Sequence, residues 1–335
     1  MIDVALEVRT TSHMSAGMRT YAQQIAEALP RVAPDLQFAR FGGGDNFDSA
    51  EQFAMPAWIV RRRPRLVHYT TPFLPIVQPR PYIATIHDLI ELRFPAYSKP
   101  KAQFYYRRIC GPLVRRATRV VAPDRRVVDD LVAEFGIDRA RARIVPLGYD
   151  PRWFAGLRAA EPLRPYVLYV GNHRRHKDLA TLLAAWAQMP AGAAIDLKLT
   201  GPSDIPELAA RHARTDAQLS FVGDLSEDEL AAAYAGARAY VHPALIEGYG
   251  LPMLEAAAAG TAVIATATSV PAALATAAWT FAPGDVRALT GLLTRAAREP
   301  AAMERLGRDL QAVARPFTWD RCAGEIAAIY REILA

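Results

Sequence analysis

Short runs of apolar residues alternate along the chain with longer segments in which apolar residues recur every three or four positions. The first pattern is typical of buried strands, and the second of helices that bury one face. In the first 150 residues these patterns predict strands over 2–8, 66–69, 82–86, 119–122 and 143–145 and helices over 17–29, 101–116 and 125–135. Strands that alternate with helices indicate a parallel sheet with helices on both faces.

The pattern breaks at a turn over 147–151 and then starts again. The second half predicts strands over 166–170, 195–200, 219–222, 239–242 and 262–265 and helices over 178–188, 226–236, 251–259 and much of 285–334. Ser226 and Glu229 have the spacing of a helix capping box. The sequence therefore predicts an α/β protein of two doubly wound, Rossmann-like domains. Ligands of such sheets bind beyond the carboxyl ends of the strands, so two facing domains would form a cleft between those ends.

The composition fits two ordinary globular domains. The chain has 335 residues, of which 51% are apolar and 22% are charged,. No apolar run approaches the roughly 18 residues of a membrane-spanning helix, and residues 1–8 resemble a strand more than a signal peptide,. Cys110 and Cys322 fit no metal-ligand spacing, so we expect two buried free thiols in a reducing cytosol,.

The positive charge lies in the first half of the chain. Residues 1–150 carry 22 Lys and Arg against 15 Asp and Glu, which accounts for the net charge of +6. The segment 97–116 mixes basic with aromatic side chains, and the arginines of 61–65 add to the same charge. An anionic membrane surface or a lipid-diphosphate acceptor is a candidate partner for this segment; the alternative is a helix with a solvated basic face. No nucleic-acid partner is expected, because no recognised nucleic-acid motif is present.

Several familiar nucleotide and hydrolase motifs are missing. The glycine-rich segment 41–45 lacks the Gly-Lys-Ser/Thr ending of a phosphate loop and is interpreted as a surface turn,. No G-x-G-x-x-G motif follows the first strand, and no G-x-S-x-G motif is present,. These absences from the sequence disfavour nicotinamide enzymes, P-loop proteins and α/β-hydrolases.

The most informative segment is 242–256, HPALIEGYGLPMLEA. A strand ends at its first residue, a loop with two glycines follows, and a helix begins near Leu251. The first amides of a helix have no internal acceptor and can bind an anion. Glu247 precedes this helix and Glu255 lies one turn inside it. Because carboxylates accept hydrogen bonds from sugar hydroxyls, the segment favours a ligand with a sugar on either side of a diphosphate; a solvated helix is the simpler alternative for each Glu alone.

Glu247 and Glu255 resemble the E-x7-E pattern of retaining GT-B glycosyltransferases, and the string EGYGLPMLEAAAAGTAVIA is similar to glycosyltransferase family four. Further segments resemble the same family: SAGMRTY at 15–21, ATIHDL at 84–89, VGNHRRHKDL at 170–179 and FVGDL at 221–225. The resemblance implies a GT-B fold with an acceptor-binding domain over 1–150 and a nucleotide-sugar-binding domain over 151–315. A terminal helix over 316–335 would return to the first domain.

The resemblance also implies roles for individual residues. His87 would line the reaction centre, Lys177 would neutralise the leaving diphosphate, and Glu247 would contact the transferred sugar. The implied donor-binding residues are Gly17, Asn172, Arg174, Arg175, Lys177, Val222, Tyr249, Gly250, Leu251 and Glu255, the last of them on the nucleotide ribose. The family's usual Arg-Lys pair reads His176-Lys177 here, so Arg174 or Arg175 is expected to supply a second cation, and the choice between them stays open.

The implied reaction is a retaining transfer that needs neither a metal nor a cofactor. Lys177, loop amides and helix dipoles would stabilise the departing diphosphate. No protein nucleophile is expected, since the acceptor hydroxyl would attack from the face of the leaving group, with a phosphate oxygen as base. One segment departs from the family: a common Leu-Pro-Glu-Val reads Val-Pro-Ala-Ala at 270–273, which leaves the donor less well defined.

We expect a hexosyltransferase that uses a nucleotide-diphosphate sugar, with a preference for GDP-mannose, and a glycan or lipid-linked saccharide acceptor in cell-surface polysaccharide synthesis. One alternative is the same fold with a UDP-sugar donor. A second alternative is a catalytically silent protein that binds a nucleotide sugar within an assembly complex, which the intact set of catalytic residues disfavours. The expected location is cytoplasmic, peripheral on the inner face of the membrane.

Overall fold

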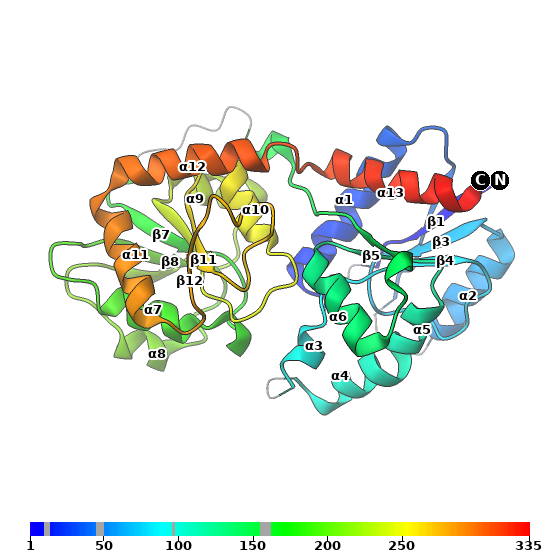
Figure 1. The fold of residues 1–335 in the computed structure, drawn as a ribbon, viewed down its shortest axis with the longest axis horizontal. Helices are drawn as coiled ribbons and strands as arrows, with labels where there is room; N and C mark the ends of the chain where they lie inside the picture. The colour runs from blue at the N-terminus through cyan, green and yellow to red at the C-terminus, as the bar shows by residue number, and fades with distance from the viewer. Residues whose placement is uncertain (10–13, 45–49, 96–97, 155–161) are drawn as a thin grey trace. The chain divides into compact units, whose positions relative to one another are not determined.

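The computed structural model describes residues 1–9, 14–44, 50–95, 98–154 and 162–335. They form two compact units, one of Met1–Gly148 with Phe317–Ala335 and one of Tyr149–Pro316. Each unit is built on one six-stranded sheet with helices around it (Figure 1). The prediction of two Rossmann-like α/β domains is thereby confirmed.

The sheet of unit 1 has the strand order β2-β1-β3-β4-β5-β6, and all neighbours are parallel. Its strands are β1 (Val4–Glu7), β2 (Phe38–Phe41), β3 (Leu66–Tyr69), β4 (Tyr82–Thr85), β5 (Arg119–Ala122) and β6 (Ala142–Ile144). The central strands β1, β3 and β4 are buried at every position, as expected of strands covered on both faces,. The order reverses between β1 and β3, which is where doubly wound sheets bind ligands.

Seven helices belong to unit 1 within the described ranges. They are α1 (Ala16–Val32), α2 (Glu51–Arg62), α3 (Ile90–Arg93), α4 (Pro100–Tyr105), α5 (Gly111–Arg116), α6 (Arg125–Phe135) and α13 (Trp319–Leu334), with the short turns η1 (Tyr106–Cys110) and η2 (Arg139–Arg141). Their inner faces complete a core with the sheet, to which α2 contributes Ile59 and α6 contributes Leu131, both fully buried.

The prediction of a helix over 101–116 is confirmed, because the backbone is helical without a gap from Pro100 to Arg116. The helix is not uniform: α4 ends at Tyr105, a π-helical turn follows, and α5 begins at Gly111. Pro112 accounts for this turn, because it has no amide hydrogen to donate and its ring would clash with the carbonyl four residues earlier in a regular α-helix. Tyr97 of the basic segment and Asp45 of the glycine-rich segment lie outside the described residues, while Phe41 ends strand β2 rather than beginning a turn.

The last helix, α13, belongs to unit 1 and packs along α1 (Figure 1). Tyr330 Oη on α13 lies 2.6 Å from Nδ1 of His68 on β3, and Nε2 of the same ring lies 2.7 Å from Thr85 Oγ1 on β4. Burial lowers the pKa of His68 to about 3, so the ring is neutral. A Cβ at Gly148 would lie 2.3 Å from the backbone carbon of Thr318, so only glycine lets the chain pass the start of α13.

The sheet of unit 2 has the order β12-β11-β10-β7-β8-β9, again all parallel. Its strands are β7 (Tyr166–Tyr169), β8 (Asp196–Leu199), β9 (Leu219–Phe221), β10 (Ala239–His242), β11 (Val263–Thr266) and β12 (Trp279–Phe281). From the centre of the sheet, β7, β8 and β9 follow one another toward one edge, and β10, β11 and β12 follow one another toward the other edge. The sheet therefore reverses its order between β7 and β10.

The remaining helical segments surround this second sheet. They are η3 (Pro151–Phe154), η4 (Arg175–Lys177), α7 (Leu179–Ala187), α8 (Pro206–Arg211), α9 (Glu227–Gly236), α10 (Leu251–Ala258), α11 (Val286–Arg298) and α12 (Pro300–Ala314). The capping box of Ser226 and Glu229 is confirmed at the start of α9. The two cysteines are free and buried, as expected.

Tyr330→Phe tests the attachment of α13. The change removes the hydrogen bond to buried His68, and we expect it to lower the free energy of unfolding by about 1–3 kcal/mol. Tyr69→Phe is the matched control in the same unit, because the buried Tyr69 hydroxyl has no partner among the described residues. Its removal should leave stability unchanged or raise it. Urea denaturation of both variants checks the contrast, and equal losses would contradict it.

Candidate functional site

Lys177 and Glu247 follow β7 and β10, the two strands between which the sheet of unit 2 reverses its order. The amide of Leu245 donates to the carbonyl of His176 at 2.8 Å, which ties the two loops together. Lys177 Nζ then forms an ion pair with Glu247 Oε2. Residues 70 positions apart in the sequence thus meet at one place, where a doubly wound sheet binds its ligand,.

Glu247 accepts two hydrogen bonds on one oxygen. Besides Lys177, His242 contacts Oε2 through its Nε2 at 3.0 Å. Burial favours the neutral carboxyl group, but Lys177 and His242 outweigh burial and hold the pKa of Glu247 well below its usual range. The other oxygen, Oε1, has no hydrogen-bond partner among the described residues. Glu247 is therefore an ionised carboxylate with one oxygen free to accept from a ligand hydroxyl.

A tight turn at Gly250 connects Glu247 to the helix α10, which begins at Leu251. Gly250 has a φ of 90°, in the region that favours glycine, and a Cβ there would lie 2.1 Å from Cε of Met253,. Tyr249 and Leu251, on either side, are buried. The first amides of α10 have no acceptor within the helix, and the helix dipole favours negative charge at this end. The turn therefore offers backbone donors to an anion beside Glu247.

Glu255 lies inside α10 and is 6% exposed. Its Oε2 accepts a hydrogen bond from the Tyr234 hydroxyl on α9 at 2.9 Å. No cation pairs with it among the described residues, so burial dominates and raises the pKa of Glu255 to about 7, although the Tyr234 hydrogen bond opposes the rise. The two acids of the motif thus have opposite electrostatic environments.

The loop between β7 and α7 contains the other predicted phosphate-binding residues. Asn172, Arg174 and Arg175 are exposed, and the amide of Arg174 donates to Asn172 Oδ1 at 3.2 Å. His176 is buried, and burial together with neighbouring Lys177 lowers its pKa to about 4. The side chain that replaces the family's arginine is therefore neutral, which leaves Arg174 and Arg175 as the candidates for a second cation.

His173 fixes this loop to its neighbour, a role that the sequence did not indicate. Its Nε2 lies 2.8 Å from the carbonyl oxygen of Thr200, after β8, and its Nδ1 contacts Asp204. Val222, one of the predicted donor-binding residues, follows β9, and its amide donates to the carbonyl of Leu199 at 2.9 Å. The loops after β7, β8 and β9 are therefore held together at the carboxyl end of the sheet.

Unit 1 contains the remaining predicted residues, His87 and Gly17. His87 follows β4 and is 8% exposed; its Nε2 lies 3.0 Å from the Thr70 carbonyl after β3, so Nε2 carries the proton. Burial lowers the pKa of His87 to about 4, which leaves a neutral ring whose Nδ1 can accept a hydrogen bond. Gly17 is the second residue of α1, and a Cβ there would meet nothing within 4 Å.

Three residues of the site in unit 2 were missed by sequence analysis: His242, Tyr240 and Tyr234. The apolar run predicted that His242 and Tyr240 belong to a strand, and it indicated no functional role for either residue. A signal was present, because alternate residues of a strand share one face, so Tyr240 and His242 had to lie side by side. Their contact is a hydrogen bond of 2.8 Å between the Tyr240 hydroxyl and His242 Nδ1.

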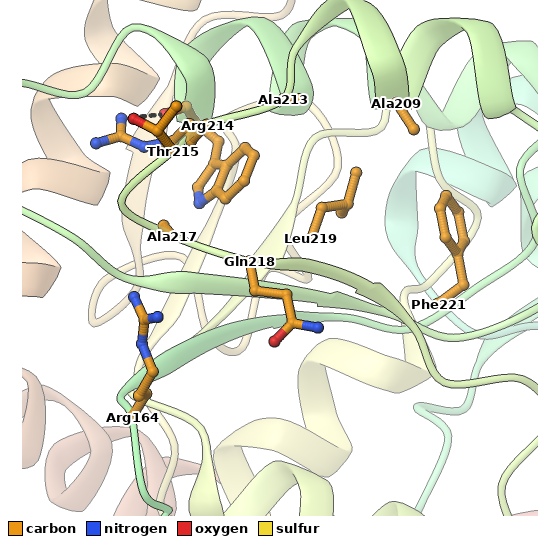
Figure 2. Close-up of a pocket in the computed structure, with 10 residues that line it drawn as sticks. Arg164, Ala209, Ala213, Arg214, Thr215, Ala217, Gln218, Leu219 and Phe221 are labelled. Carbon is orange, nitrogen blue, oxygen red and sulfur yellow. Dashed lines mark hydrogen bonds between the residues drawn. The ribbon is translucent and has the colours of Figure 1, made fainter.

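A pocket of about 450 Å³ lies on unit 2 along the edge strand β9 and near α8 (Figure 2). It is lined by Arg164, Trp186, Ala209, Ala213, Arg214, Thr215, Ala217, Gln218, Leu219 and Phe221. None of the predicted site residues lines it. Arg214 is satisfied by bonds to Asp216 and to the carbonyls of Trp186 and Met189. The pocket is therefore separate from the Lys177–Glu247 site.

Two further searches cover the described residues only. No three side chains of His, Cys, Asp or Glu gather there as a metal-binding group. Among the helices that the structure describes, none has the length and apolar character needed to cross a membrane.

Comparisons with known proteins agree with this architecture. A family model described as "Glycosyltransferase Family 4" matches residues 16–153, and one described as "Glycosyl transferases group 1" matches residues 164–299. The sucrose-phosphate synthase structure from Thermosynechococcus elongatus is similar in fold, with a TM-score of 0.78, 22% identity and 99% of each chain covered.

Two curated relatives are mannosyltransferases. The MMP alpha-(1->4)-mannosyltransferase of Mycolicibacterium hassiacum is 28% identical over 280 residues, covering 76% of this chain and 66% of the relative. The O-antigen chain mannosyltransferase B of Escherichia coli is 27% identical over 173 residues, covering 50% of this chain and 45% of the relative. This chain thus matches between about half and two thirds of the length of these relatives.

Two adjoining family models account for most of the chain, one for each unit, and the sucrose-phosphate synthase structure has the same two-unit architecture. The chain belongs to the family-four-like glycosyltransferases and has the GT-B fold.

Proposed function

We propose that this chain transfers a hexose, with retention of configuration and without a metal, from a nucleotide-diphosphate sugar to a glycan or lipid-linked saccharide. The observation that carries the proposal is the ion pair of Lys177 with Glu247 beside the amino end of α10. The same pair of loops therefore contains a cation, unpaired backbone donors and a carboxylate with one free oxygen. This set matches the charges and hydroxyls of a sugar attached to a diphosphate.

In the proposed reaction Lys177 and the amides of Gly250 and Leu251 bind the diphosphate and stabilise its charge as it departs. Glu247 binds the transferred sugar, and Glu255 binds the nucleotide ribose. The strong hydrogen bonding of Glu247 makes it a weak nucleophile, which supports attack by the acceptor hydroxyl from the leaving-group face. His87 of unit 1 is also a proposed catalytic residue, because its Nδ1 can accept a hydrogen bond.

The preferred donor is GDP-mannose, and the preferred pathway is cell-surface polysaccharide synthesis. Both preferences are supported by the names of two relatives, which are mannosyltransferases, one of them named as an O-antigen chain mannosyltransferase. The alternatives are a UDP-sugar donor and a silent nucleotide-sugar-binding protein. Incubation of the purified chain with GDP-mannose, UDP-glucose and UDP-galactose and with saccharide acceptors distinguishes them. Transfer from GDP-mannose with an α-linked product by NMR is expected; tight binding without turnover would favour the silent protein.

Lys177→Ala is expected to lower kcat by about 10²–10³-fold, because the leaving diphosphate loses its main counter-charge. The matched control is Lys198→Ala on β8, where the ammonium lies 3.7 Å from the centre of the Tyr166 ring, outside the site. It should leave kcat unchanged. Steady-state kinetics with saturating donor measures both variants, and equal kcat values for the two would contradict the assignment of Lys177.

Binding of the nucleotide sugar should weaken as the pH falls below about 7. Glu255 has a raised pKa of about 7, and only its ionised form accepts hydrogen bonds from both ribose hydroxyls. Affinity should therefore fall by up to about tenfold for each pH unit below that value. Glu255→Gln should bind weakly at every pH. Calorimetry with an intact nucleotide sugar, whose phosphates do not titrate in this range, checks both profiles; parallel profiles would exclude Glu255 as the titrating group.

We also propose that unit 1 binds an anionic membrane surface. The exposed apolar side chains of unit 1 include five on α2, α4 and the loop after β3: Phe53 by 77%, Val60 by 58%, Ile76 by 59%, Val77 by 60% and Phe104 by 61%. The loop after β3 links their elements, because the Ile76 amide donates to Gln52 Oε1 on α2 at 2.9 Å and the Phe73 ring lies 5.7 Å from that of Tyr105 on α4. Exposed cations lie on or next to the same helices: Arg61, Arg62, Arg63, Lys99, Lys101, Arg107 and Arg108. Exposed apolar side chains together with cations suit the interface of an anionic bilayer.

Vesicles that contain phosphatidylglycerol should bind the chain, and neutral phosphatidylcholine vesicles should bind it weakly. The double variant Ile76→Ser with Phe104→Ser should lower the affinity at least about tenfold, because it removes most of two exposed apolar side chains. Leu163→Ser is the control, since Leu163 is fully exposed on unit 2. Co-sedimentation measures all three proteins. Equal binding of the double variant and the wild type would contradict the proposed surface.

A further inference from the structure

We propose that His242, itself held by Tyr240, is a positioning residue that keeps Glu247 oriented with Oε2 toward the protein and Oε1 toward the donor sugar. The inference deepens the proposed function and rests on it for its catalytic meaning. Neither His242 nor Tyr240 is among the predicted site residues. Their geometry, however, forms one continuous chain of hydrogen bonds that ends at Glu247.

The chain of contacts begins inside β10. Tyr240 and His242 are two residues apart on one strand, so their side chains lie on the same face of the sheet,. The Tyr240 hydroxyl lies 2.8 Å from His242 Nδ1, and His242 Nε2 lies 3.0 Å from Glu247 Oε2. Tyr240 and His242 are fully buried. Because both ring nitrogens have a partner, any rotation of the imidazole loses two buried hydrogen bonds.

Only one arrangement of protons satisfies these contacts. Burial lowers the pKa of His242, so the ring carries one proton, and ionised Glu247 can only accept,. That proton must therefore lie on Nε2. Nδ1 then accepts from Tyr240, whose pKa burial raises well above the usual value, so that its hydroxyl keeps its hydrogen. The Val170 carbonyl, at 3.4 Å, is a poorer acceptor for the same hydroxyl,.

The two donors to Glu247 differ in mobility. Lys177 reaches Oε2 with a long, flexible side chain, and the proposed function requires the same ammonium to bind the diphosphate. His242 is fixed to the sheet and cannot follow the ligand. When Lys177 turns to the diphosphate, His242 remains as the donor that keeps Glu247 charged and oriented. Oε1, which has no partner among the described residues, stays available to a sugar hydroxyl.

Other titratable groups surround Glu247, and they limit how pH effects are interpreted. They come from β7, the loop after it and β10: Tyr169, His176, Lys177, Tyr240 and His242. The pKa of Tyr169 is raised by burial, and the pKa of His176 is lowered to about 4. Glu255, with a pKa of about 7, is the group that titrates near neutrality. Measuring kcat at saturating donor removes its effect on nucleotide binding.

His242→Leu removes the donor to Glu247 and keeps an apolar side chain on the strand. We expect kcat to fall by about 10- to 100-fold, the range that corresponds to the loss of one hydrogen bond to a charged group. The variant should also lose activity toward acidic pH where the wild type does not, because Glu247 becomes easier to protonate. Binding of the free nucleoside diphosphate should be unchanged, since Glu247 contacts the sugar. His242→Gln should recover part of kcat, because its amide can donate to Oε2.

Nitrogen NMR of the histidine rings provides a readout that does not depend on turnover. In the wild type we expect a neutral His242 with its proton on Nε2 at pH 7. Tyr240→Phe removes the donor to Nδ1 and with it one of the two hydrogen bonds that hold the ring, so we expect a loss of a few-fold in kcat while the proton stays on Nε2 beside Glu247. This variant also covers the case in which His242→Leu does not fold.

Several results would overturn the inference. One is a folded His242→Leu variant with the kcat and pH profile of the wild type. A second is an equal loss of nucleoside diphosphate binding and transfer, which would indicate a merely structural role. A third is a charged His242 or an Nδ1–H tautomer in the wild type, or a folded Tyr240→Phe variant with the kcat of the wild type. Failure of the wild type to transfer from any nucleotide sugar would instead reject the proposed function, and the ring spectrum would still decide the inference.

Discussion

The contact between Lys177 and Glu247 is the interaction on which the site depends. It joins the two loops that leave the sheet of unit 2 at its point of reversal, and the backbone bond from Leu245 to His176 holds those loops in register. The two side chains are only 12% and 14% exposed. A pair so poorly hydrated adds little net stability, because desolvation offsets most of the attraction. Its value lies in keeping a cation and a carboxylate charged at a place shielded from water.

The two acids of the motif show how far environment, rather than residue type, decides the chemistry. Glu247 has two donors on one oxygen and remains ionised, whereas Glu255 has one neutral donor and titrates near neutrality. Titratable groups whose pKa values are pushed apart commonly divide the tasks of a site between them. One acid is suited to constant charge beside the reacting sugar, and the other to a hydrogen-bonding role at the nucleoside.

Much of the fold was predictable because local signals agreed with the tertiary structure. The strands Leu66–Tyr69, Arg119–Ala122 and Ala239–His242 and the helix Arg125–Phe135 have the bounds that the pattern predicts. That helix has both an N-cap, Asp124, and a left-handed Gly136 at its end. The pattern missed β2, α2, α3, α8 and β12, which are short, partly exposed or contain a proline. Their existence depends on pairing and packing with distant segments, which periodicity does not report.

The candidate site was predictable in outline and not in its electrostatics. The glycines and acids after β10 indicated an anion-binding turn, and the family resemblance added Lys177. Whether His176 is a cation or a neutral ring depends on its burial in the folded unit, where a distant loop bonds to its backbone carbonyl through the amide of Leu245. The free oxygen of Glu247 likewise depends on which way His242 faces. Charge states in this site are properties of the folded unit.

The position of α13 has a consequence for the order of folding. Unit 1 is discontinuous in the chain, since all of unit 2 separates its sheet from the helix that covers α1 and reaches His68. During synthesis the sheet of unit 1 emerges first, yet Tyr330 becomes available only after the second unit has left the ribosome. Closing so long a loop adds only a slowly growing entropic cost. Of the two units, the one whose sheet is translated earlier is therefore completed later, and the side of α1 that packs on α13 stays uncovered until α13 has been made.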